Sequence, residues 1–336
     1  MGHTVTFYPT HPKTQSWQEV YQDIPRNIEV MANAAAPQLE YFLKKRSLQY
    51  SIILVSRPEN MAIVKNILAK GFINRNNTRV IYDAEALFSP REAAKQKLKG
   101  MELSEQQIAE MLSAELELTK ECNAVFTTSN KEKQSFLEHG QRKTTVLRHS
   151  VEPKLSQNAF SDRKNILFVG PLYNDESPNT DSIYWFIKDI FPLIRQQLPD
   201  MQFIHAGINE SSRIQALNKD SVKMMGKVND LTELYNTARI FIAPTRFAAG
   251  VPIKIYEAAA HGLPIVCTSL LAEQLEWENE KDLLVADTPE AFAAQCIRLY
   301  QDETLWEKLR TNALERIKNE CSPEAFYQTL KDTISP

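Results

Sequence analysis

The stretch FAAGVPIKIYEAAAHGLPIV, residues 247–266, contains the features that decide the fold. The strand RIFIAP ends just before it at Pro244, and a helix is expected to begin near Val251 with Pro252 in its first turn. A helix that starts directly after a strand offers free backbone N–H groups and the positive end of its dipole to an anion. Gly250 would let that anion approach the backbone closely. The stretch therefore predicts an anion-binding turn in an α/β domain.

Two charged residues lie inside this helix. Lys254 and Glu257 are three residues apart and therefore on one face. We expect Lys254 to meet a diphosphate, and Glu257, one turn deeper, to accept hydrogen bonds from ribose hydroxyls. A surface ion pair worth roughly a few tenths of a kcal/mol explains the same spacing. Arg246, in the preceding loop, is a second candidate cation and equally a candidate surface residue.

Short β-branched runs alternate with helical segments along the whole chain, which is typical of βαβ units on parallel sheets. Helices are expected over 104–120, 182–197 and 289–299, where apolar residues recur every three or four positions. The pattern predicts an α/β fold. The strand-like runs are TVTFY, YSIILVS, RVIYDA, AVFTTS and TTVLRHS, followed by NILFVG, QFIHAG, SVKMMG, RIFIAP and LPIVCTS.

The length of the chain favours two domains, because 336 residues exceed what one hydrophobic core usually serves. Between the two sets of strands lies VEPKLSQNAFSDRKN, a polar stretch without periodicity that contains Pro153 and resembles a linker. We therefore expect an N-terminal domain over 1–154, a C-terminal domain over 155–321, and a last helix over 322–336 that crosses back to the N-terminal domain.

Several glycines stand at or beside the ends of the expected elements, where a tight turn favours a residue without Cβ. Each alone is explained as a cap. Together they suggest a phosphate or nucleotide across the carboxyl ends of the strands, where ligands bind in open α/β sheets. These glycines are Gly170, Gly207, Gly226 and Gly262.

Composition narrows the class of protein. With 43% hydrophobic and 24% charged residues and a net charge of -3, the chain has no basic footprint for nucleic acid. Its four cysteines are scattered without a CxxC pair, and no signal segment opens the chain, which favours a reducing cytoplasm. The apolar runs fall well short of the roughly 20 residues needed to cross a bilayer.

Three segments resemble a known family: LFVGPLYNDESPNTDSIYWFIKDIFPLI, MMGKVNDLTELYNTARIFIAPTRFAAGVPIKIYEAAAHGLPIV and LLVADTPEAFAAQCIRLYQDETLWEKL. They look like the GT-B glycosyltransferases, whose two Rossmann-like domains have parallel sheets facing across a cleft, and within them the retaining family 4, or glycosyl transferases group 1. The resemblance is close over about 160–320. It is looser in the N-terminal half, through SRPEN, VIYDAEALFSPRE and AVFTTSNKEKQSFLEHG.

The resemblance implies that the C-terminal domain binds a nucleotide sugar. It places Glu257 on the donor ribose as the second glutamate of a pair, whose first member would fall at Ala249; this departure leaves the sugar open. It also implies that Val228 offers backbone hydrogen bonds to the base, and that Arg246 or Lys254 balances the diphosphate. The donor-binding residues implied are Gly170, Gly226, Val228, Arg246, Gly250, Val251, Lys254 and Glu257.

The acceptor side is expected in the N-terminal domain. The resemblance places Glu85 where many relatives have a histidine that lines the acceptor site, and a carboxylate at a strand end can orient a hydroxyl. Capping of loop amides by Asp83 and Glu85 is the alternative, as helix capping is for Ser129. Arg57 also stands at a strand end. Asp83 and Glu85 mimic an Asp-x-Asp metal motif, yet without a histidine or cysteine cluster we expect no metal.

The resemblance as a whole implies an enzyme that moves a hexose, with retention, from a nucleotide-diphosphate sugar to a glycan, lipid-linked or cell-surface polysaccharide acceptor. The catalytic candidates are Glu85, Lys254 and Glu257, with no cofactor. The leaving diphosphate itself would take the proton of the acceptor hydroxyl, so the two carboxylates of a glycosidase are not required. A lipid-linked acceptor would bring this cytoplasmic chain to the inner face of the membrane as a peripheral protein.

The start of the chain supports a second hypothesis about the function. MGHTVTFYPTHP resembles the second strand of the family's N-terminal domain, so we expect the first strand, its glycine-rich loop and the first helix to be absent. A non-catalytic partner of another transferase, which binds a nucleotide sugar or a glycan, is therefore the alternative function.

Overall fold

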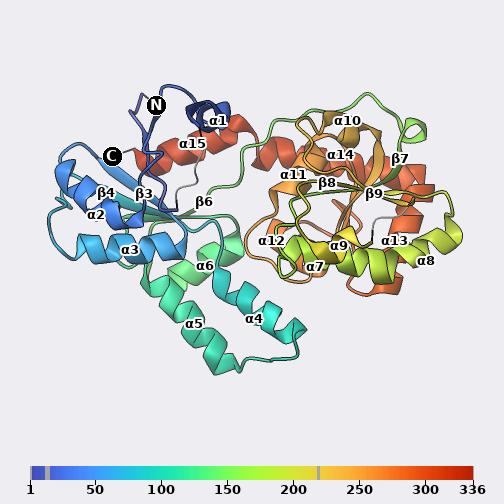
Figure 1. Cartoon of the computed structure of the whole chain (residues 1–336), viewed down its shortest axis with the longest axis horizontal. Helices are drawn as coiled ribbons and strands as arrows, with labels where there is room; N and C mark the ends of the chain where they lie inside the picture. The colour runs from blue at the N-terminus through green and yellow to red at the C-terminus, as the bar shows by residue number, and fades with distance from the viewer. Residues whose placement is uncertain (1, 12–15, 218–219, 336) are drawn as a thin grey trace.

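The computed structural model describes residues 2–11, 16–217 and 220–335, which form two domains joined by a linker (Figure 1). The N-terminal domain is drawn in blue to green and the C-terminal domain mostly in yellow to red. Each domain has a parallel sheet, one of four strands and one of six, so the α/β prediction is confirmed. β1 (Thr6–Phe7) and β2 (Glu29–Val30) pair in parallel outside the four-stranded sheet.

The C-terminal sheet has the strand order β12-β11-β10-β7-β8-β9. The order runs outward from β7 through β8 and β9, and outward from β10 through β11 and β12. Ligands of open α/β sheets bind where this direction reverses, here outside the carboxyl ends of β7 and β10. The strands are β7 (Lys164–Val169), β8 (Phe203–Ala206), β9 (Val222–Met224), β10 (Ala238–Ala243), β11 (Ile265–Cys267) and β12 (Leu284–Val285).

Helices cover both faces of this sheet. On β7, Ile166 and Phe168 pack toward α7, α8 and α13, whereas Leu167 and Val169 pack toward α11 and α12, because successive side chains of a strand point to opposite faces. The helices are α7 (Pro178–Trp185), a π turn (Phe186–Ile190), α8 (Phe191–Gln197), α9 (Ser212–Gln215), α10 (Thr232–Thr237), α11 (Ile253–Ala260), α12 (Ser269–Leu275), α13 (Pro289–Gln301) and α14 (Glu303–Glu320), with a 3-10 turn at Phe160–Asp162 before β7.

The N-terminal sheet has the order β3-β4-β5-β6. Val80 and Tyr82 of β4 face one core, while Ile81 faces another to which the last helix, α15 (Pro323–Ile334), contributes Leu330 and Ile334. The last helix therefore packs on the N-terminal sheet, as Figure 1 shows in red. The other elements are α1 (Trp17–Asp23), α2 (Ala36–Lys45), β3 (Ile52–Ser56), α3 (Pro58–Leu68), β4 (Arg79–Asp83), α4 (Phe88–Leu98), α5 (Glu105–Glu117), β5 (Ala124–Thr127), α6 (Asn130–Glu138) and β6 (Thr144–Val146).

Two helices differ from the expected ranges. α11 begins at Ile253, not near Val251, and Pro252 is its N-cap in an extended conformation. The residue before a proline disfavours the helical conformation, so Val251 stays outside the helix. The helix expected over 182–197 begins at Pro178 and contains the π turn, because Pro192 lacks the N–H that a regular turn needs.

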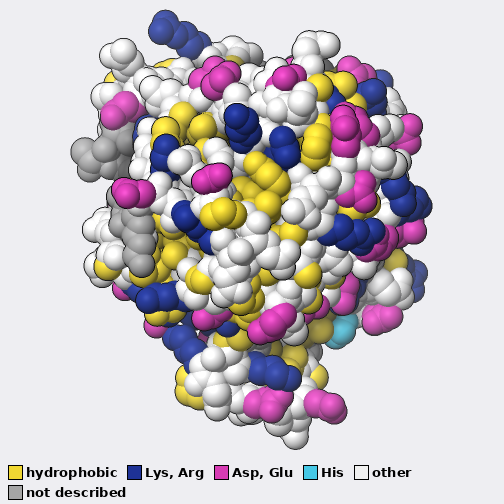
Figure 2. All heavy atoms as spheres, turned by 90° about the vertical axis from the view of Figure 1, so that its right-hand side faces the viewer, with side chains coloured by type: hydrophobic (Ala, Val, Ile, Leu, Met, Phe, Trp, Pro, Cys, Tyr) yellow, Lys and Arg dark blue, Asp and Glu magenta, His cyan; other side chains and the backbone are white. Residues whose placement is uncertain are grey.

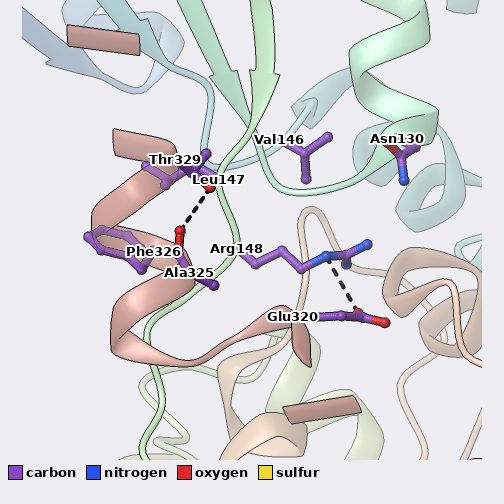
Figure 3. Close-up of a pocket in the computed structure, with 8 residues that line it drawn as sticks. All are labelled: Asn130, Val146, Leu147, Arg148, Glu320, Ala325, Phe326 and Thr329. Atoms are coloured by element: carbon purple, nitrogen blue, oxygen red, sulfur yellow. Dashed lines mark hydrogen bonds and ion pairs between the residues drawn. The ribbon is translucent and has the colours of Figure 1, made fainter. Parts of the chain in front are cut away.

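The chain passes between the domains twice, once in the linker after β6 and once between α14 and α15. The two passages lie side by side, because the N–H of Val151 donates to the carbonyl of Cys321 at 2.8 Å. Next to them, the Arg148 guanidinium lies 2.7 Å from Glu276 and 3.5 Å from Glu320. A cavity of about 180 Å³ lies here between the linker and α15 (Figure 3).

The contact between Arg79 and α15 leads to a first testable prediction. The Arg79 guanidinium donates to the carbonyls of Thr333, Ile334 and Ser335 at 2.8 to 3.0 Å, where the helix has no further N–H groups. Arg79→Met should therefore loosen the last turn of α15, with hydrogen exchange there about tenfold faster or more, since hydrogen bonds to charged groups contribute roughly 1.5–3 kcal/mol. The exposed Arg142→Met is the control. Equal exchange in both variants would contradict the prediction.

The surface of the C-terminal domain carries charges of both signs. Figure 2 shows its outer end, where dark blue Lys and Arg side chains are separated by magenta Asp and Glu and by uncharged groups. This face offers no continuous basic surface. Among the helices within the described ranges, none is long and apolar enough to cross a membrane.

Candidate functional site

Three loops meet at the carboxyl ends of β7, β8 and β9. The N–H of Gly170 donates to Ala206 at 2.9 Å, and the N–H of Gly207 donates to Gly226 at 2.8 Å. A Cβ on Gly207 would lie 2.3 Å from the carbonyl oxygen of Gly170, so a larger residue would force these loops apart. The buried His205 ring fixes the same carbonyl through Nε2 at 2.8 Å. The glycines thus allow close packing of the loops at the carboxyl edge of the sheet.

Lys254 is a cation held by neutral partners. Its Nζ donates to Asn179 Oδ1 at 2.5 Å and lies 4.3 Å from the centre of the Phe168 ring. Among the described residues, none of the carboxylates forms an ion pair with Lys254. Burial lowers the pKa of this ammonium to about 7, because desolvation penalises its charged form. An anion beside Lys254 would restore the charge, and this makes the position suited to a phosphate.

Glu257 lies one turn further along α11. Its Oε2 accepts a hydrogen bond from the Tyr235 hydroxyl at 3.2 Å. Burial of the phenol, together with the charge of Glu257, raises the pKa of Tyr235. The i,i+3 ion pair that would have explained the sequence spacing is not formed within the described part of the chain. Lys254 and Glu257 therefore each have a separate hydrogen-bond partner.

Arg246 is the second cation of the site. Its guanidinium binds both oxygens of Asp181, at 2.9 and 2.5 Å, and lies 5.2 Å from the centre of the Trp185 ring. Asp181 already balances its charge. Because Asn179 and Asp181 both lie at the start of α7, this one helix positions both cations.

The remaining donor-side candidates lie in the same region. Gly226 has a φ of +68°, and no atom of the described residues lies within 4 Å of the place of a Cβ, so a glycine is needed here for the turn and not for a close contact. Val228 packs against the core on one face of the sheet, and its backbone groups have no hydrogen-bond partner among the residues described. Val251 is buried in the same core.

Gly250 has a role that the sequence did not reveal. Its φ is +69°, and a Cβ there would lie 2.5 Å from the carbonyl oxygen of Glu85 in the other domain. The space on the Cβ side of this glycine is therefore taken by the backbone of the N-terminal domain, while its place in donor binding stays a prediction. The loops that follow β4 and β10 thus meet at the domain boundary.

The acceptor-side candidates Arg57, Asp83 and Glu85 come together at the ends of β3 and β4. Arg57 Nε lies 3.0 Å from Glu85 Oε2, and the Ser56 hydroxyl donates to Asp83 at 3.1 Å. Arg57 and Glu85 have φ angles of 76° and 47°, which non-glycine residues adopt at a cost, and such positions cluster at functional sites. Ser129 differs from these three residues because its side chain is used as a helix cap. Its buried hydroxyl caps α6 by accepting from the N–H of Glu132 at 3.3 Å.

Charge is also complementary across the domain boundary. Lys95 of α4 and Lys99, the C-cap of the same helix, both lie 2.9 Å from Glu176, in the loop before α7, and these lysines lower the pKa of that carboxyl to about 2. Lys131 of α6 lies 3.1 Å from Glu273. In each pair the cation belongs to the N-terminal domain and the anion to the C-terminal domain. Exposed pairs of this kind contribute little to stability but favour one orientation.

Sequence reasoning missed several residues of the site. Asn179 and Asp181 stand in SPNTDS, which reads as a helix start, and only the folded chain shows that they meet Lys254 and Arg246. His205 looked like an ordinary strand residue. Among the residues described, no group of three or more His, Cys, Asp or Glu gathers as metal ligands would.

Comparison with known proteins finds relatives of the C-terminal half and structures that share the fold of the whole chain. Residues 163–302 match the family described as glycosyl transferases group 1. Two curated relatives are each 24% identical: an uncharacterized 44.6 kDa protein in the cps region of Klebsiella pneumoniae, over 178 residues, and an uncharacterized glycosyltransferase of Haemophilus influenzae, over 153 residues. The matches cover 50% and 43% of this chain and 45% and 41% of those proteins, so the chain spans less than half the length of either relative.

Among solved structures, Anabaena HepE in complex with UDP and glucose is similar with a TM-score of 0.71. The match covers 99% of both chains at 13% identity, a level that shows a shared fold alone. The described architecture and this match agree on two Rossmann-like domains with parallel sheets. The chain therefore has the GT-B fold, and its residues 163–302 match the glycosyl transferases group 1 family.

Proposed function

We propose that this chain transfers a hexose from a nucleotide-diphosphate sugar to a hydroxyl of a glycan, a lipid-linked acceptor or a cell-surface polysaccharide, with retention. The observation that carries the proposal is Lys254, a desolvated ammonium without a carboxylate partner in the described chain, beside the point where the strand order reverses. HepE is solved with UDP and glucose, so UDP-glucose is the first donor to test.

The positions of the donor-side residues support one role for each of them. Lys254 would hold the charge that develops on the departing diphosphate, assisted by the first N–H groups of α11. Glu257, whose second carboxylate oxygen has no partner among the described residues, would accept hydrogen bonds from the ribose. Arg246 would contribute less, because its guanidinium would have to bind the diphosphate and Asp181 at the same time.

The acceptor would lie between the domains. Glu85, held by Arg57, would orient the attacking hydroxyl, and Asp83 and Ser129 would border the same strand ends. The leaving diphosphate would take the proton from that hydroxyl on the same face of the sugar. A lipid-linked acceptor would require the protein to work at the inner face of a membrane.

Loss of Glu257 provides the first test of this function. Glu257→Ala should weaken UDP binding and lower release of UDP from UDP-glucose by about 10–100-fold, because a hydrogen bond to a charged group contributes roughly 1.5–3 kcal/mol. UDP release is measured in a coupled assay and UDP affinity by calorimetry. Glu315→Ala, on the exposed face of α14, is the control. Equal turnover in Glu257→Ala and wild type would contradict the donor site.

The same experiment separates the alternative function. Tight UDP binding by the wild type without any turnover would favour the non-catalytic, sugar-nucleotide-binding partner of another transferase. A panel of UDP, GDP, dTDP and ADP sugars in a thermal-shift assay identifies the base, since a ligand at about a hundred times its Kd adds roughly 2.7 kcal/mol to stability.

A further inference from the structure

The start of α4 lacks a cap of its own and is capped by two other helices. Its N-cap, Leu87, has no side-chain capping bond. Instead, the N–H of Leu87 donates to Glu132 of α6 at 2.9 Å, and the N–H groups of Phe88 and Ser89 donate to Glu115 of α5 at 2.8 and 2.9 Å. Two carboxylates therefore satisfy three successive amides at the positive end of a helix dipole.

Both carboxylates are surrounded by donors. The Ser89 hydroxyl donates to Glu115 at 2.6 Å, and the Thr128 hydroxyl lies 2.9 Å from Glu132. Burial raises the pKa of the Glu132 carboxyl, and the hydrogen bonds that it accepts lower this pKa in part. Because both oxygens of a carboxylate accept, each glutamate can bind donors on two sides, whereas an amide side chain accepts only on its one oxygen and donates from its NH2 group.

This network reaches the domain boundary. The Thr128 hydroxyl that binds Glu132 also lies 3.4 Å from the carbonyl oxygen of Glu85. That oxygen is the atom that a Cβ on Gly250 would meet at 2.5 Å. A continuous series of contacts thus runs from Glu132 through Thr128 and the Glu85 carbonyl to the donor-side loop of the other domain.

We propose that Glu115 and Glu132 are positioning residues that set the Glu85 loop against Gly250 and so fix the geometry in which the two domains meet. Their effect on turnover rests on the proposed function. Their effect on the contact between domains does not, because it follows from the hydrogen bonds alone. Neither carboxylate is bonded to the donor-side residues, so nucleotide affinity is expected to stay unchanged.

Hydrogen exchange tests the contact. In Glu132→Gln, the side-chain NH2 group replaces an acceptor oxygen and therefore faces a donor. We expect hydrogen exchange at least tenfold faster in 85–89 and also, across the domain boundary, in 248–252. Glu138→Gln on α6 and Glu110→Gln on α5 are matched controls, since each of these exposed glutamates accepts from a glutamine four residues earlier. Faster exchange confined to 85–89 would show a merely local role and overturn the proposal.

Turnover tests the consequence. Glu132→Gln and Glu115→Gln should lower the kcat for UDP release from UDP-glucose about tenfold, with the Kd for UDP within twofold of wild type. A parallel loss of UDP affinity would overturn the positioning role. If the wild type has no turnover, the proposed function fails while the exchange result still decides the contact. Thr128→Val removes only the hydroxyl between Glu132 and Glu85, so it gives the same test if a carboxylate variant does not fold.

Discussion

Lys254→Met is expected to lower the kcat for UDP release from UDP-glucose by about 10²–10³-fold, the usual loss when one preorganised donor to a developing charge is removed. Methionine fills nearly the same space but carries no charge. Lys254 is the cation at the carboxyl ends of β7 and β10 that lacks a carboxylate partner in the described residues, whereas Arg246 is already bound to Asp181. Arg246 is therefore a poor substitute for it.

The control for this variant is its stability. Because the pKa of Lys254 is held near 7, charging it opposes folding, and methionine should leave the melting temperature at neutral pH unchanged or higher. Lys223→Met, at an exposed position on β9, should change neither property. Full activity of Lys254→Met, or a loss of activity matched by unfolding, would contradict the assigned role.

The affinity for UDP is expected to fall with rising pH above about 7, by up to tenfold per pH unit. Lys254 has a pKa of about 7 in the free protein, and a bound diphosphate raises that pKa by favouring the charged form. The contribution of the charge to affinity is therefore fully present below pH 7. It is lost as the pH rises from 7 toward the pKa of the complex.

Calorimetry in buffers of different ionisation enthalpy measures this linkage. Near pH 8, UDP binding should take up close to one proton, and Lys254→Met should remove that uptake and flatten the pH dependence. Measurements between pH 7 and 9 avoid titration of the phosphate itself, whose pKa is about 6. A pH-independent affinity of the wild type in this range would contradict a neutralised Lys254.

Much of the fold could be predicted because its signals are local. The β-branched runs became strands, and the α/β class followed from their alternation with helices. β2 and β12, of two residues each, gave no run long enough to detect. The start of α11 was misplaced because Pro252 was assigned to the first turn, although a proline also keeps the residue before it out of the helix.

The site was less predictable because its contacts join distant segments. Lys254 and Glu257 were found from helix spacing, but their partners Asn179 and Tyr235 come from other βα units, and no spacing connects them. Gly250 was expected to admit a ligand, yet its lack of a side chain admits the backbone of a loop 165 positions earlier in the chain, at Glu85. A positive φ angle explains why a position needs glycine. Which atoms lie against that glycine depends on how distant segments pack.

The two passages of the chain between the domains lie side by side at Val151 and Cys321, and together they form a double-stranded hinge. We expect such a joint to permit rotation of one domain against the other about the line through both passages, and to resist twisting about the long axis of the molecule. We therefore expect the two halves to tumble together with a single rotational correlation time. A substrate would enter when the domains rotate apart about this one axis. The reverse rotation would return the same loops to contact after every cycle.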